Sequence, residues 1–287
     1  MADSLPFTRS AAATRKGTTH PINEDAWRIL DATTPIVKQT RRGVLYAVAD
    51  GVSSTQQGQY AAQMTCNRLE GFFTAEEPPE AATLQQILLG IDAELAGGGR
   101  GKAACTLTSM WIFDYKAMAF HVGNSECLRV RGREIVSITP VPGKGSRRQL
   151  KEFVGMGKLE KYLNFGEADV EIGDVLLLFT DGVREAIEEN QVLADLWLQS
   201  ANDPEAFVAS VIRICEEKQV EDDATIIAVH MLGMETIRTR SWRRTETCRP
   251  VFWNLVSFRR RSVSAMAATI ATSRITDASS NGYTYCV

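Results

Sequence analysis

Cysteine and histidine patterns that bind metal are missing from this sequence. Its 287 residues include six cysteines and three histidines, and no two cysteines form a Cys-x-x-Cys pair. A zinc site built from clustered nitrogen and sulfur ligands is therefore not expected. Several cysteines lie within apolar runs, which favours buried free thiols in a reducing cytoplasm over disulfides.

Long apolar segments are missing too. No run approaches the roughly 18 apolar residues that a membrane-spanning helix needs. Residues 1–7 combine neither a basic start nor a long apolar stretch, so no signal peptide is expected. The sequence therefore predicts a protein without a membrane span, located in the cytoplasm.

Basic residues are outnumbered by acidic ones over most of the chain and outnumber them at one end. Residues 235–287 contain nine arginines, no lysine and three acids, whereas residues 1–234 carry nine more acidic than basic residues. An acidic body argues against general nucleic-acid binding and suits a site loaded with cations.

Acidic residues stand at the ends of apolar runs. Residues 44–49 have the pattern of a buried strand and lead into Asp50, and residues 175–180 lead in the same way into Asp181. A glycine follows each aspartate, so either pair taken alone is also typical of a simple turn. The recurrence of the pattern favours a functional site.

Two further acidic pairs come directly before apolar runs, Glu24-Asp25 and Asp222-Asp223. If the strands that begin there run antiparallel to the strands that end at Asp50 and Asp181, all these acids gather at one end of the sheets. Such carboxylates repel by roughly 4 kcal/mol per pair at 4 Å with an effective dielectric near 20. Bound divalent cations would neutralise them.

The ligand chemistry narrows the choice of metal. Oxygen ligands without nitrogen or sulfur suit Mg²⁺ or Mn²⁺. Two such ions roughly 3.5–4 Å apart can hold a hydroxide and clamp an in-line displacement at phosphorus. The acids therefore predict a two-ion site for phosphoryl chemistry.

Five short motifs occur in order along about residues 8–232: Asn23–Asp25, Ala47–Gly51, Gly123–Ser125, Ile172–Gly182 and Asp222–Ile227. Together they resemble the metal-dependent protein phosphatase family, the type 2C serine/threonine phosphatases, and in particular its compact bacterial members. The resemblance implies an α+β fold, a four-layer α-β-β-α sandwich with two central, mainly antiparallel sheets.

The resemblance also implies roles for individual residues. Asp50 would bridge two ions, Gly51 would offer its backbone carbonyl, and Asp181 and Asp222 would be direct ligands. These residues form the expected catalytic metal set.

Three acids are expected in supporting positions. Glu24 and Asp25 would hold water bound to the metals and orient the nucleophile. Asp223 stands where the family usually has asparagine, so we expect it to support the site rather than to bind metal.

Three departures from the family pattern bear on activity. One is the polar loop over residues 52–58 after Asp50-Gly51, which stands where the family has a glycine-rich stretch and could change access to the site. His20 stands where the family has a phosphate-binding arginine, and an imidazole cannot form the two-pronged contact of a guanidinium. His20 could donate one hydrogen bond to phosphate, or it could be an ordinary loop histidine. Asn124 stands where many bacterial members have an aspartate for a third metal, which puts a functional third ion in doubt.

The function implied is a Mn²⁺- or Mg²⁺-dependent protein phosphatase. A hydroxide that bridges the metals would attack phosphoserine or phosphothreonine in a phosphorylated protein, opposing a serine/threonine kinase. One alternative is a catalytically weak or inactive relative that binds phosphoproteins as a regulator. Another is a phosphatase for small phosphate esters or for a partner-switching regulator.

Element boundaries follow from periodicity and from turn residues. We expect helices over about 57–73, 83–95 and 204–218. Strands are expected over about 7–14, 26–30, 44–50, 105–113, 117–122, 127–131, 134–138, 175–180 and 225–231.

The chain divides into a catalytic domain over residues 1–233 and a basic extension over residues 234–287. The extension could be a docking tail, a disordered segment or out-of-frame sequence, and disorder is the interpretation we favour.

Overall fold

Two antiparallel sheets form the centre of the described fold in a computed structural model, which describes residues 4–99, 102–140 and 152–236. Among these residues, one sheet has the order β1 (Ser4–Arg15), β10 (Ala224–Thr236), β9 (Val175–Phe179), β6 (Glu126–Arg131) and β7 (Glu134–Ser137). The other sheet has the order β2 (Ala26–Leu30), β3 (Val44–Ala49), β4 (Leu107–Phe113), β5 (Lys116–Val122) and β8 (Asn164–Asp169). All neighbouring strands pair antiparallel.

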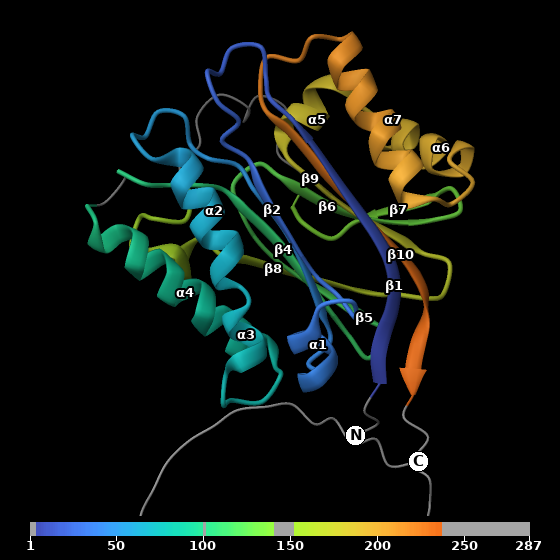
Figure 1. The fold of residues 1–287 in the computed structure, drawn as a ribbon, viewed down its shortest axis with the longest axis horizontal. Coiled ribbons are helices and arrows are strands. Elements are labelled where there is room, and N and C mark those ends of the chain that lie inside the picture. Colours follow the sequence, from blue (N-terminus) through green and yellow to red (C-terminus); the bar gives the residue numbers. More distant parts are fainter. Residues whose placement is uncertain (1–3, 100–101, 141–151, 237–287) are drawn as a thin grey trace, which may run out of the picture. The chain divides into compact units, whose positions relative to one another are not determined.

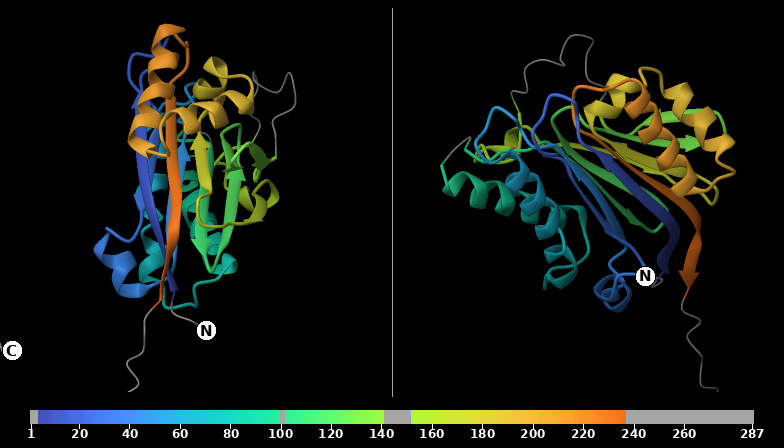
Figure 2. Two further views of the ribbon diagram at one scale, coloured as in Figure 1. Left: turned by 90° about the vertical axis from the view of Figure 1, so that its right-hand side faces the viewer. Right: turned by 45° about the horizontal axis from the view of Figure 1, so that its top comes forward.

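Helices cover the outer face of each sheet (Figure 1). The β2–β8 sheet carries α2 (Gly58–Arg68), α3 (Gly71–Thr74) and α4 (Ala81–Gly97). The β1–β7 sheet carries α5 (Asp181–Ala186), α6 (Asn190–Gln199) and α7 (Pro204–Glu217). Two short elements, α1 (Pro35–Thr40) and the 3-10 turn η2 (Leu159–Lys161), complete the set. The predicted four-layer α-β-β-α sandwich is confirmed, and Figure 2 shows its layers from two further sides.

Burial explains why the central strands are apolar throughout. All six residues of β3 and all five of β9 are buried, because each strand lies between a helical layer and the opposite sheet. One apolar cluster fills the space between the sheets and beneath α2–α4, and a second fills the space between the β1–β7 sheet and α5–α7. Strands that are buried on both faces do not alternate between polar and apolar residues.

Helix α7 has the start that its sequence predicts. The Asp203 side chain accepts a hydrogen bond from the Glu205 backbone N–H at 3.1 Å, and Pro204 occupies the first turn. Phe207, Val211 and neighbouring apolar residues on one side of the helix are buried against the sheet.

Several boundaries differ from the sequence-based expectation. The single helix expected over 57–73 is two helices, because the chain turns after Arg68 and α3 starts only at Gly71. Phe72 and Phe73 of α3 are both buried and pack edge to face at 5.4 Å. Strand β10, expected over 225–231, continues to Thr236 at the start of the expected extension and pairs there with the start of β1. The remainder of the expected extension lies outside the described residues.

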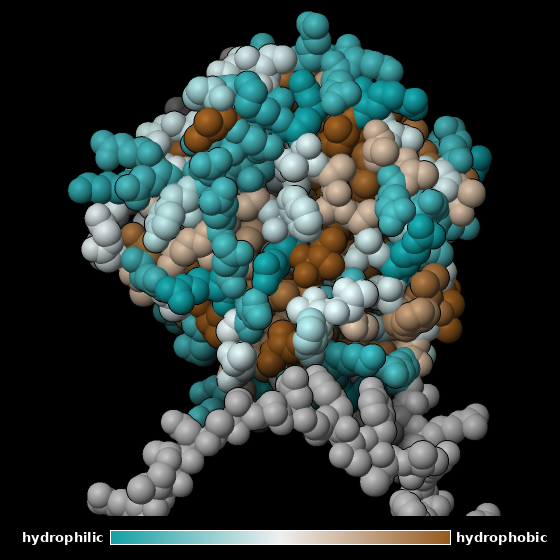
Figure 3. All heavy atoms as spheres, viewed as in Figure 1, coloured by the Kyte–Doolittle hydropathy of each residue, from teal (hydrophilic) through white to brown (hydrophobic). Residues whose placement is uncertain are grey.

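No helix within the described ranges is long and apolar enough to span a membrane. On the face shown in Figure 3, hydrophilic side chains cover most of the upper part, where the loop between β1 and β2 lies. Four cysteines of the described chain, at positions 66, 105, 127 and 215, are buried and free.

Candidate metal-binding active site

Strand register brings the predicted acids together in two groups. Ala26 pairs with Ala49, so Asp25 precedes one strand at the point where Asp50 follows its neighbour. In the other sheet Ile226 pairs with Phe179, which places the Asp222-Asp223 segment beside the end of β9 that leads to Asp181. In each sheet, the acids thus lie together at one end of a pair of antiparallel strands.

A threonine connects the two groups. Thr180 Oγ1 donates a hydrogen bond of 2.9 Å to Asp25 Oδ2 and accepts one of 2.9 Å from the Thr225 N–H. All three residues are buried, and Asp25 belongs to the opposite sheet. The acid-bearing ends of both sheets therefore form one site.

Glycines allow the acid-bearing segments to approach closely. A Cβ atom on Gly51 would lie 2.5 Å from the carbonyl carbon of Gly58 and 2.8 Å from the carbonyl oxygen of Glu24. A Cβ atom on Gly182 would lie only 2.1 Å from the carbonyl oxygen of Asp223. Real Cβ atoms are not found so close to backbone atoms, so these glycines are required for the packing of the site.

Buried oxygen atoms without a hydrogen-bond partner mark the interior of the site. Asn124 Nδ2 donates a hydrogen bond of 2.6 Å to Asp181 Oδ2. The other oxygen of each side chain, Asn124 Oδ1 and Asp181 Oδ1, is buried and unpartnered among the described residues, and so is Asp25 Oδ1. Unpaired buried oxygens are costly in free energy, and cation binding is one way to satisfy them.

Burial and mutual repulsion raise the pKa values of the same acids. Burial raises the pKa of Asp181 to about 7, with further contributions from the charges of Asp222 and Glu185. The pKa values of Asp25 and Asp50 are raised well above their ordinary range by burial and then by the neighbouring carboxylates. The cluster therefore needs protons or cations at neutral pH, and its oxygen-only interior fits Mg²⁺ or Mn²⁺.

Asp223 uses its carboxylate within the protein. Its Oδ1 accepts the Gly17 N–H at 2.7 Å, and its Oδ2 accepts the Glu24 N–H at 2.7 Å and lies 3.0 Å from His20 Nδ1. Only 2% of the residue is exposed. This arrangement holds the segment that carries Glu24 and Asp25, and it leaves Asp223 poorly placed to serve as a metal ligand.

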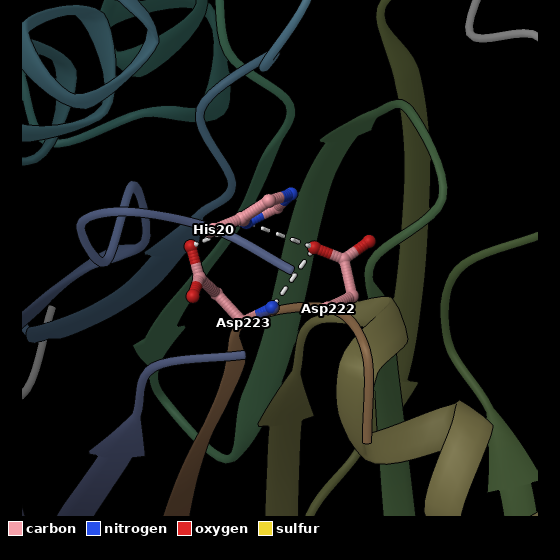
Figure 4. A group of neighbouring side chains, drawn as sticks. All are labelled: His20, Asp222 and Asp223. Carbon is pink, nitrogen blue, oxygen red and sulfur yellow. Dashed lines mark hydrogen bonds and ion pairs between the residues drawn. The ribbon is translucent and has the colours of Figure 1, made fainter. Parts of the chain in front are cut away.

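His20, Asp222 and Asp223 are the one group of three His, Cys, Asp or Glu side chains in the described parts of the chain whose ligand atoms all lie within 4.8 Å of one another (Figure 4). His20 Nδ1 lies 3.6 Å from Asp222 Oδ1, so the histidine contacts both aspartates through the same nitrogen. Burial lowers the pKa of His20, but the hydrogen bond to Asp223 and the charge of Asp222 raise it, and the net shift is upward. An imidazole that donates to carboxylates has no lone pair for metal at that nitrogen, so the group is an ion-paired support rather than a second metal site.

Helix α5 holds the segment that precedes β10. Glu185 accepts hydrogen bonds from the backbone N–H groups of Glu221 at 3.0 Å and Asp222 at 3.4 Å. Arg184 forms two hydrogen bonds of 2.7 Å with the carboxylate of Glu126 and thereby attaches α5 to β6. These contacts fix the backbone of Asp222 while leaving its side chain half-exposed.

Glu24 and Gly51, the remaining residues expected from the sequence, also lie at the acid-bearing end of the sheets. The Glu24 carbonyl accepts the Gly51 N–H at 3.2 Å, which joins the two acid-bearing segments of the β2–β8 sheet. Ser53 lies in the polar loop after Gly51, with its Oγ 3.3 Å from His20 Nε2. The sequence marked this loop as a departure from the family pattern, but it did not predict the contact. A serine in a polar loop carries no sequence signal for such a contact.

The family model described as Protein phosphatase 2C matches residues 17–223, which include all the acids of the site together with His20 and Asn124. No curated protein gives a significant match. One similar solved structure is that of PppA, a key regulatory component of the T6SS in Pseudomonas aeruginosa. It is 24% identical, the match covers 80% of this chain and 100% of that chain, and the TM-score is 0.66.

Two other solved structures are serine/threonine phosphatases. The catalytic domain of PstP, in complex with 2 manganese ions, is 18% identical with a TM-score of 0.65, and the match covers 79% of this chain and 99% of that chain. Stp1 from Staphylococcus aureus is 19% identical with a TM-score of 0.66, and the match covers 79% of this chain and 96% of that chain. At these identities the structural likeness establishes the fold.

Proposed function

The chain belongs to the protein phosphatase 2C family, and on this premise we propose that it is a Mn²⁺- or Mg²⁺-dependent phosphatase acting on phosphoserine or phosphothreonine in proteins. One observation carries the proposal: a buried group of carboxylates with raised pKa values contains oxygen atoms that no described residue satisfies. A structural role alone gives no reason to bury such a group.

Asp50, Asp181 and Asp222, with the backbone carbonyl of Gly51, would hold two ions. When bound, these ions would supply Lewis-acid stabilisation of phosphoryl charge and an activated water for in-line attack on phosphorus. Thr180 keeps the Asp25 carboxylate beside the centre, where Asp25 would orient solvent. Glu24 would share this role.

His20 is at the rim of the acid group, at the position of the family's phosphate-binding arginine. Its Nδ1 is engaged by Asp223, which leaves Nε2 on the side of Ser53. The imidazole ring is therefore oriented before any substrate binds. In this orientation it would contact the phosphate group of the substrate.

The test is phosphate release from a phosphothreonine peptide with Mn²⁺, with Mg²⁺ and with EDTA. We expect metal-dependent release by the wild-type protein and a loss of more than about 100-fold in Asp50→Asn, because a ligand carboxylate becomes a neutral amide. In EDTA, the melting temperature of Asp50→Asn should equal or exceed that of the wild type, since a repelled buried charge is removed. Near-normal turnover by the variant would contradict the assignment.

A regulator that binds phosphoproteins without useful turnover is the second candidate. The observations that favour it are His20 in place of arginine and Asn124 in place of aspartate. Tight binding of the phosphopeptide without release under any metal condition would support it. For either function we expect a phosphorylated protein partner, an opposing kinase and a cytoplasmic location, in keeping with the buried free cysteines.

A further inference from the structure

Three side chains from three separate segments form a continuous line of contacts at the rim of the site. Asp223 Oδ2 lies 3.0 Å from His20 Nδ1, and His20 Nε2 lies 3.3 Å from Ser53 Oγ. Figure 4 shows one ring nitrogen of His20 directed toward both Asp222 and Asp223, and the second ring nitrogen directed away from both. Asp223 is buried, whereas Ser53 is exposed, so the line runs from the interior to solvent.

Hydrogen-bond accounting fixes which nitrogen of His20 carries hydrogen. An ionised carboxylate only accepts hydrogen bonds, and Asp223 already accepts two backbone N–H groups. The hydrogen between Asp223 and His20 therefore belongs to Nδ1. Nε2 is left to contact Ser53 Oγ, accepting from the hydroxyl when the ring is neutral and donating to its oxygen when the ring is charged. In both cases the hydroxyl hydrogen of Ser53 can turn to an incoming acceptor.

The same order of residues activates a serine nucleophile in some hydrolases. Here the surroundings do not favour that use. Attack by a serine builds negative charge on the substrate oxygen, and the carboxylates of Asp222 and Asp223, which contact His20, would oppose it. The exposed hydroxyl suits a different task, which is to donate to a phosphoryl oxygen once the acids are neutralised.

We propose that Ser53, held in place by the Asp223–His20 pair, is a phosphoryl-binding residue of this site. The proposal rests on the proposed function and adds the residue that meets the substrate's phosphate. A serine hydroxyl and an oriented imidazole, 3.3 Å apart, replace the two-pronged contact of a single guanidinium. Asp223 and His20 act as positioning residues for Ser53.

The experiment compares Ser53→Ala with Ser54→Ala in the full chain. Ser54 is the next residue in the same loop, is also exposed, and makes no hydrogen bond within the described structure, so it is a matched control. With the phosphothreonine peptide, Ser53→Ala should raise KM about tenfold and change kcat less than about twofold, as expected for a lost hydrogen bond to a charged group. Ser53→Thr, which keeps the hydroxyl, should restore KM.

A binding measurement separates this inference from the proposed function. Inorganic phosphate is titrated into Mg²⁺-loaded protein labelled with ¹⁵N-histidine, in which three histidines give few signals. His121 and His230, which lie in β5 and β10, are internal references. Phosphate should shift the His20 signal in the wild type and in Ser54→Ala, with about tenfold weaker affinity in Ser53→Ala.

Equal KM values and equal phosphate affinities for Ser53→Ala and Ser54→Ala would overturn the role of Ser53 and leave the phosphatase assignment intact. Absence of phosphate release by the wild-type protein with either metal would instead refute the proposed function. In that case the titration still decides whether Ser53 binds a phosphoryl group.

Discussion

Asn124 shows how one neutral side chain can change the proposed metal site. Its amide donates to Asp181 Oδ2 at 2.6 Å and so uses one of the two carboxylate oxygens. The other oxygen of Asp181 stays free for a cation. An ionised aspartate at this position could neither donate that hydrogen bond nor avoid repelling an ionised Asp181, unless another ion were bound between them.

Asn124→Asp should therefore destabilise the metal-free protein. A lost buried hydrogen bond and a new like charge each cost about 1–3 kcal/mol, and roughly 2–4 °C in melting temperature accompany each kcal/mol. Saturating Mn²⁺ should recover more of the melting temperature in the variant than it adds in the wild type. Differential scanning calorimetry with EDTA and with Mn²⁺ checks this, and an equal Mn²⁺ increment in both proteins would count against the explanation.

At the residue scale the acids were predictable and their neighbours were not. Asp50 and Asp181 stand directly after strands whose apolar runs are visible in the sequence. The contacts of Ser53 with His20 and of Asn124 with Asp181 join residues 33 and 57 positions apart. Asp92 looks like a surface residue of a helix, yet its buried carboxylate accepts three backbone N–H groups from residues 155–159. Only folding reveals such pairs.

Helix α5 shows how an element can depend on the absence of a side chain. Alanine normally stabilises a helix by about 1 kcal/mol relative to glycine. Gly182→Ala should do the reverse by about 1–3 kcal/mol, because its Cβ atom would lie 2.1 Å from the Asp223 carbonyl oxygen and that backbone cannot yield cheaply. Urea unfolding measures the change, and turnover should fall with it because Asp223 is displaced.

Gly90 in α4 is the matched control. Nothing lies within 4 Å of a Cβ atom there, and the residue is exposed. Gly90→Ala should stabilise the protein by about 0.4–1 kcal/mol. If both substitutions stabilise the protein, the close approach at Gly182 is not as tight as the structure indicates.

The elements that could be predicted are those whose burial follows a regular pattern along the sequence. Strands β3 and β9 are apolar along their whole length, and α7 has a capped start and one apolar side. The predictions missed α6, in which exposed Val192 and Leu198 obscure the buried side. They also missed the edge strand β8, whose residues are mostly exposed. Burial in these two elements depends on tertiary neighbours.

Stability should depend on pH through the whole site. The pKa of Asp181 rises from 3.8 to about 7 on folding, so the folded protein binds more protons than the unfolded chain over that interval. Its stability therefore falls as pH rises from about 4 to 7. The raised pKa of His20 acts in the same direction, since stabilisation by its protonated form is lost as pH rises through the folded-state value.

Melting temperatures of the wild type and Asp181→Asn, measured in EDTA from pH 4 to pH 8, test this effect. The wild type should lose stability relative to the variant over the interval, and Mn²⁺ should reduce the loss because cations take the place of protons. Parallel curves for the two proteins would show that Asp181 is not the source.

The pairing of β10 between β1 and β9 has a consequence for when the protein becomes active. This strand comes last in the described fold and follows directly on Asp222 and Asp223, while its partner β1 comes first. A nascent chain still on the ribosome lacks two of the acids and the central pairing of one sheet until this strand emerges. Unfinished or prematurely terminated products would therefore lack the complete acid cluster, so the proposed phosphatase activity would begin only with a finished domain.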